Sequence, residues 1–325
     1  GNVRGQQPGA ERHFEPGLWE ADLLDLEEIL EAEIVPEGMG EDLIPRRPWM
    51  ELRALFAGEF FKGHIRGSEQ VTEADVFALY GPVMTEMEWY RTELALAFFP
   101  TEDWLFQLRA GYLEIWGLVE SASAPSFEVQ VEGLSDVELL FGRNFEWGSS
   151  TRLQLRMGVE LPTGSVEEVV EGKFAPPALQ LGTGALTYVP GLTVQHRWRS
   201  WHFGVNFDVE WREGANDRGY DFGTSYTGSV WANRQIWGEL RLSGALLGQY
   251  VETLDAQPLN PGPLLHAQGE NYGGHLYEVI LGARYGFADG RCELGASVSL
   301  PIFESANGIR LEKSWGASVG LSMKF

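Results

Sequence analysis

Apolar and polar side chains alternate with a period of two along most of the chain, and the final fifteen residues show this most clearly. One face of residues 311–325 carries large apolar side chains, namely Trp315, Ala317, Val319, Leu321, Met323 and Phe325. Successive side chains of a β-strand point to opposite faces, so this stretch predicts a strand that is apolar on one side only. It is longer than a soluble strand of about five or six residues. It suits a tilted membrane-crossing strand, which needs about nine to eleven. For this stretch alone, the last strand of a soluble sandwich is the alternative.

The same alternation recurs along the chain and predicts about twelve strands. We expect them over residues 49–60, 83–99, 104–112, 137–142, 151–161, 186–195, 201–212, 222–230, 240–250, 277–285, 292–300 and 311–325. Long connections, including 61–82, 118–134, 162–183 and 252–274, alternate with short turns. A slip of phase near Arg91 indicates a β-bulge. The pattern therefore predicts an all-β protein, an antiparallel up-and-down transmembrane β-barrel with long loops at one end and short turns at the other.

Composition supports a barrel and removes other classes. The chain has 40 glycines and 12% aromatic residues, which suits a barrel with aromatic girdles, and no apolar run is long enough for a transmembrane helix. A net charge of -23 argues against nucleic-acid binding, and a single cysteine excludes an internal disulfide. We expect a location in the bacterial outer membrane, with lipid and the barrel assembly machinery as partners. The terminal Phe325 resembles an assembly signal, and an even strand number would place both termini in the periplasm.

Residues 1–47 differ from the barrel region, 48–325. They contain twelve acidic and four basic residues, a net charge of -8. Helical spacing within them predicts a short amphipathic helix whose apolar side chains are Leu23, Leu26, Leu30 and Ile34. This acidic leader could plug the lumen or the periplasmic mouth, or dock on a periplasmic or membrane protein partner. A disordered, solvated leader is the alternative.

The face opposite the apolar one carries charges on almost every predicted strand. The lumen-lining residues that this predicts are Arg109, Glu138, Arg152, Arg156, Glu160, Asp208, Glu210, Arg212, Glu239, Arg241, Glu278 and Arg284. Such charges can line a pore that selects solutes. They can also pair across strands and close the lumen, which would make the barrel a structural anchor for an envelope complex. A barrel of about twelve strands lies between small filled barrels and wide porins, so both readings stay open.

Catalytic chemistry is not indicated. The six histidines show no metal-ligand spacing and no nucleophile motif stands out, so we expect neither an enzyme nor a cofactor or metal site.

Several short motifs occur in a fixed order from residue 133 onward. They are Gly-Leu-Ser-Asp at 133–136, Leu-Pro-Thr-Gly-Ser at 161–165, Leu-Gln-Leu-Gly-Thr-Gly at 179–184, Pro-Gly-Leu at 190–192, Asp-Arg-Gly-Tyr at 217–220 and Arg-Leu-Glu-Lys-Ser-Trp at 310–315. In this order they resemble the phenol-degradation (meta-pathway) transporter-like family of outer-membrane proteins. The resemblance covers about residues 48–325 and implies a barrel that passes small, often aromatic, solutes. No binding residue can be carried over from it.

Overall fold

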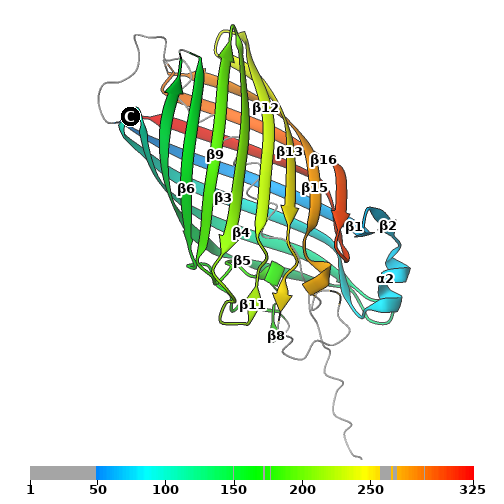
Figure 1. Cartoon of the computed structure of the whole chain (residues 1–325). Helices are drawn as coiled ribbons and strands as arrows, with labels where there is room; N and C mark the ends of the chain where they lie inside the picture. Colours follow the sequence, from blue (N-terminus) through cyan, green and yellow to red (C-terminus); the bar gives the residue numbers. More distant parts are fainter. Residues whose placement is uncertain are drawn as a thin grey trace, which may run out of the picture.

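Twelve long strands form a closed antiparallel barrel in the computed structural model (Figure 1). The structure describes residues 49–148, 150–170, 173–175, 177–256, 265, 269–288 and 290–325. The barrel strands are β1 Trp49–Arg66, β3 Val83–Thr101, β4 Trp104–Glu120, β5 Phe127–Trp147, β6 Thr151–Leu161, β9 Thr187–Trp198, β10 Trp201–Arg212, β12 Ser225–Trp237, β13 Leu240–Val251, β15 Gly274–Phe287, β16 Cys292–Ala306 and β17 Ile309–Lys324. Each pairs with its neighbours in sequence, and β17 pairs with β1 to close the ring. The predicted barrel is confirmed, whereas the leader, with Leu23, Leu26, Leu30 and Ile34, lies outside the described residues.

The two ends of the barrel differ in their connections. Tight turns join strands at the end where Phe325 exchanges backbone hydrogen bonds with Met50. The small elements gather at the other end (Figure 1), and they are β2 Glu69–Val71, α2 Glu73–Leu79, β7 Val169–Val170, β8 Lys173–Phe174, η1 Pro177–Leu179, β11 Tyr220–Asp221, β14 Asp255–Ala256 and η3 Gly269–Asn271. Two predicted connections were too long: residues 118–134 mostly extend β4 and β5, and β16 turns tightly into β17. No helix in the described part of the chain is long and apolar enough to cross a membrane.

The outward face of the barrel is apolar and ends in aromatic belts. On β10, Phe203, Val205 and Phe207 are exposed between Trp201 and Trp211. The stretch from Trp201 to Trp211 matches the length of a tilted membrane strand, which is about nine to eleven residues. Aromatic pairs on adjacent strands extend the belt next to the long loops, and they are Phe60–Trp315, Tyr188–Trp211, Tyr226–Tyr250 and Tyr277–Phe303. An exterior of this kind is solvated by lipid rather than by water.

Replacing Val205 with arginine tests this surface. Val205 is 51% exposed at the middle of the apolar band, so we expect the arginine to destabilise the barrel by about 2–4 kcal/mol. Unfolding in lipid bilayers would measure the change, with Val205→Leu as a control that keeps the site apolar. Equal stability of the two variants would contradict a lipid-facing position.

The inward face changes its chemistry along β3 without changing phase. Arg91 and Glu93 point inward, and so do Met87 and Trp89 further toward the long loops. The predicted bulge near Arg91 is wrong, because β3 pairs with β1 without a register shift from Glu86 to Phe99. The apparent slip arose because the barrel wall continues beyond the aromatic belt, where side chains facing out meet water and side chains facing in form a core.

A bulge in β17 does change the phase of that strand. Strict alternation from Phe325 would turn Lys313 toward lipid, but the pairing with β1 passes from Trp315 to Lys313 and skips Ser314. Lys313 therefore points inward and is 2% exposed. From the bulge toward the C-terminus, the alternation of Val319, Leu321 and Met323 follows the prediction.

Candidate functional site

A chain of ion pairs crosses the inner wall formed by β3, β4 and β5. Arg91 Nη2 lies 2.6 Å from Glu93 Oε2. Arg109 Nε lies 3.5 Å from the other Glu93 oxygen, and its Nη2 lies 2.8 Å from Glu138 Oε2. Glu93, Arg109 and Glu138 are all buried, so these charges neutralise one another inside the barrel.

The next pair spans two strand spacings. Arg156 on β6 donates from Nη2 to both carboxylate oxygens of Asp208 on β10, at 2.8 and 2.6 Å. Strand β9 lies between them, and Gly191 stands at the crossing point. A Cβ at Gly191 would collide with the Asp208 carboxylate, so glycine is what permits the two charges to meet over β9.

A third group lies toward the long loops. Arg212 Nη2 donates to Glu210 at 2.7 Å, and its Nη1 donates to the Gly223 carbonyl at 2.9 Å. Glu160 faces the same region from β6, because Thr187 pairs with both Glu160 and Arg212. These contacts tie the charged wall to the connection between β10 and β12.

The most deeply buried charges lie where the ring closes. Lys313 Nζ lies 2.5 Å from Glu59 on β1 and 3.0 Å from Glu278 on β15, and all three side chains are inaccessible to solvent. Nearby, Glu304 receives the Lys313 backbone N–H at 3.0 Å and pairs with Arg310 at 2.6 Å.

The predicted lumen residues near the short turns are less enclosed. Glu293 receives both Arg241 at 3.0 Å and Arg284 at 3.5 Å, and Arg152 lies 3.3 Å from Glu146. Glu239 differs from the prediction: β12 extends to Trp237, which leaves Glu239 exposed in the turn.

Sequence reasoning missed several of the paired charges. Arg91, Glu93, Glu59, Lys313, Arg310 and Glu304 were not among the predicted lumen residues. Glu59 was detectable, since it lies on the polar side of β1. Lys313 was not, because only the bulge at Ser314 turns it inward. In the described ranges, no set of three or more His, Cys, Asp or Glu side chains is arranged to hold a metal ion.

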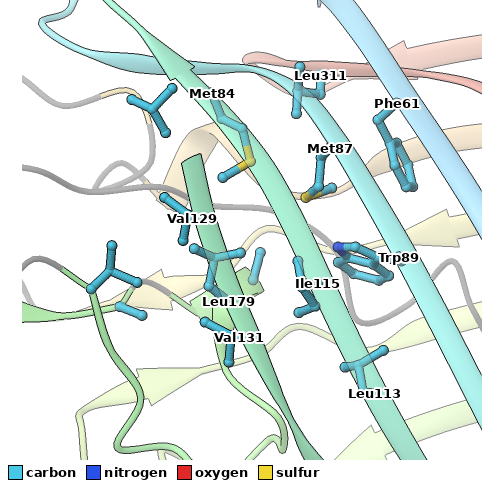
Figure 2. Close-up of a cluster of buried hydrophobic side chains, with 14 of the residues drawn as sticks. Phe61, Met84, Met87, Trp89, Leu113, Ile115, Val129, Val131, Leu179 and Leu311 are labelled. Atoms are coloured by element: carbon cyan, nitrogen blue, oxygen red, sulfur yellow. The ribbon is translucent and has the colours of Figure 1, made fainter. Parts of the chain in front are cut away.

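An apolar cap fills the barrel between the charged lumen and the long loops. Here Met84, Met87, Trp89, Leu113, Ile115, Val129 and Val131 point inward, and Phe61 and Leu311 join them (Figure 2). The loop between β6 and β9, residues 162–186, supplies Leu179 and Leu181, which are 1% and 4% exposed. Figure 2 shows Leu179 lying close to Val129 and Val131. The loop thus enters the barrel and packs there as a hydrophobic plug. We call residues 162–186 the cap loop.

One carboxylate holds both ends of the cap loop. Asp136 on β5 accepts the backbone N–H of Gly164 at 2.7 Å, and the backbone N–H and hydroxyl of Thr183 at 2.8 and 3.0 Å. Gly133 lets the loop approach β5, because a Cβ there would lie 2.5 Å from the Leu181 side chain.

A second strand connection secures the same base. Asn216 Nδ2 donates to the Thr183 carbonyl at 2.8 Å, and Arg218 Nε donates to the Val166 carbonyl at 3.3 Å. The motifs at 133–136, 161–165, 179–184 and 217–220 therefore converge on one place, the base of the cap loop. Their order is visible in the sequence, but their meeting point is not.

Comparisons with known proteins show the fold. No protein-family model matches the chain, and no curated protein matches it. The crystal structure of an outer-membrane channel from Pseudomonas putida F1 is similar over 86% of this chain and 96% of its own, at 12% identity and a TM-score of 0.59. The NanC porin (8% identity, 84% of this chain, 100% of its own) gives a TM-score of 0.48. A FadL homologue from Pseudomonas aeruginosa (12% identity, 86% of this chain, 90% of its own) gives a TM-score of 0.41.

Proposed function

We propose that this protein is a bacterial outer-membrane channel that passes small solutes, aromatic ones included, through a narrow charged lumen gated by the cap loop. The observation that carries the proposal is the cap loop itself. It is a separate segment, bound to the barrel wall at its base by Asp136 and inserted by Leu179 and Leu181 into an apolar chamber. A barrel that served only as an anchor could fill this chamber from its own strands, whereas a channel benefits from a plug that can withdraw.

Two further features support this function. The apolar exterior and its aromatic belts suit the outer membrane, and the short-turn end, where Met50 and Phe325 meet, corresponds to the periplasmic side of such barrels. The converging motifs are those that resemble the phenol-degradation transporter-like family. Kinship with that family, a role for Phe325 in assembly and a docking or plugging role for the leader remain parts of the proposal.

Expelling the plug tests the proposal. Aspartate at both Leu179 and Leu181 would bury two unpaired charges in the apolar chamber, so the loop should withdraw. We expect the KCl conductance of single barrels in planar bilayers to rise at least severalfold over the unmodified protein. Val169→Asp is the matched control, because Val169 is 53% exposed in the same loop. A double variant that folds, as unheated gel mobility would show, yet conducts no current would favour a closed structural barrel instead.

A further inference from the structure

Three polar side chains form a row across the inner wall at mid-barrel. Asn206 on β10 pairs in register with Thr193 on β9 and with Ser229 on β12. All three point inward and are 1–4% exposed. Adjacent strands are about 4.8 Å apart, so the row offers hydrogen-bonding groups at regular short intervals over three strands.

The polar atoms of this row have no partner within the protein. Neither Oδ1 nor Nδ2 of Asn206 is hydrogen-bonded, and the Thr193 and Ser229 hydroxyls are also unpaired. A buried polar atom without a partner costs more free energy than a formed hydrogen bond returns. The pair of lumen hydroxyls on Ser297 and Ser318 avoids this cost by a mutual contact of 2.8 Å. A wall that only had to keep the barrel closed would be more stable with apolar residues in the row.

An apolar patch adjoins the row on its β12 side. Trp231, Ala245, Leu247 and Ile280 pack together and are buried. Ser229 pairs with Leu247, so the row passes directly into the patch. The Trp231 indole lies over Gly204, where a Cβ would collide with the ring, and it is thereby next to Asn206. Its Nε1 is a further buried donor without a partner.

We propose that the row and the patch together, Thr193, Asn206, Ser229, Trp231 and Leu247, form a solute-binding strip in the lumen. The strip rests on the proposed channel function and specifies its solute class. Its unpaired groups are an amide, two hydroxyls and an indole N–H, all uncharged. The charges on neighbouring positions are held in ion pairs: Asp208 binds Arg156, and Glu278, which pairs in register with Leu247, binds Lys313. The matching ligand is a small uncharged molecule with an apolar, preferably planar, body and one hydroxyl or carbonyl group.

Benzyl alcohol and ethylbenzene are suitable probes, since they have similar shapes but only the first carries a hydroxyl. Binding to the full-length protein in detergent would be measured by equilibrium dialysis against protein-free micelles. Asn206→Leu removes both hydrogen-bonding groups at nearly constant size, and Trp231→Phe keeps the aromatic patch but removes its donor. Ser297→Ala with Ser318→Ala is the matched control, because these lumen hydroxyls satisfy each other.

We expect Asn206→Leu to weaken benzyl alcohol binding about five- to tenfold and Trp231→Phe about two- to fivefold, as loss of one or two hydrogen bonds implies. Ethylbenzene binding should not weaken in Asn206→Leu and should change less than benzyl alcohol binding in Trp231→Phe, and the serine control should bind both probes normally. The proposed binding strip would be wrong if Asn206→Leu left the benzyl alcohol affinity unchanged. It would also be wrong if the unmodified protein showed no saturable binding. Conductance is measured separately, so a barrel that binds but does not conduct would instead refute the channel.

Discussion

Replacing Lys313 with methionine is expected to destabilise the barrel by about 3–5 kcal/mol, because it would leave the carboxylates of Glu59 and Glu278 buried without a cation. Equilibrium unfolding followed by tryptophan fluorescence and gel mobility would measure the loss. The effect should be large because all three side chains are inaccessible to solvent. Lys313 and Glu59 also lie on the last and first strands, whose pairing closes the barrel.

Two controls separate burial from the mere loss of a charge. Lys62→Met breaks a 2.6 Å pair with Glu86, but these side chains are 70% and 37% exposed, so its loss should change the stability of the barrel very little. Combining Lys313→Met with Glu59→Gln and Glu278→Gln should recover much of the lost stability, since no net charge then remains buried. A Lys313→Met barrel as stable as the Lys62→Met barrel would show that the buried cluster is not as the structure describes it.

Replacing Asp136 with alanine is expected to release the cap loop while the barrel stays folded. The carboxylate accepts three hydrogen bonds from the loop base, and hydrogen bonds to charged groups contribute about 1.5–3 kcal/mol each. Water replaces part of these hydrogen bonds once the loop opens, so we expect a net loss of roughly 3 kcal/mol in local stability, which corresponds to about a hundredfold faster amide exchange over residues 164–183. Conductance should rise in parallel.

Thr183→Val is the graded control for this prediction, since it removes one of the three hydrogen bonds and keeps the two backbone ones. Its exchange rates should fall between those of the unmodified protein and Asp136→Ala. If loop amides exchange equally slowly in all three proteins, the cap loop is held by its apolar contacts and Asp136 is not its anchor.

The barrel was predictable because a lipid-facing strand repeats one simple rule, apolar outside and polar inside. Strands β6 and β10 obey that rule from end to end, and their predicted bounds agree with the structure. The rule also located many charges that the structure pairs inside, such as Arg156 and Asp208. Which charges pair was not predictable, because partners like these lie on strands separated by another strand.

The failures have a common physical origin. Periodicity reports only which face a residue occupies, and not which medium surrounds that face. On β3 the medium outside the barrel changes from lipid to water along one strand, so the change of pattern near Arg91 was wrongly interpreted as a bulge. The cap loop was missed for a related reason, since residues 162–186 carry no alternation and their place inside the barrel follows from contacts with Asp136 and Gly133.

The change of chemistry along β3, β4 and β5 divides these strands into a lipid-facing part and a part beyond the aromatic belt. The two parts should tolerate opposite kinds of substitution. Near Leu94 and Leu108 an outward position should tolerate only apolar side chains. Glu88 and Glu114 also point outward, further along the same strands, and their positions should accept almost any hydrophilic residue. A complete mutational scan would therefore show the preference for each face reversing near Tyr90 and Tyr112. The point of reversal, strand by strand, would trace one surface of the membrane on the protein without any lipid being observed.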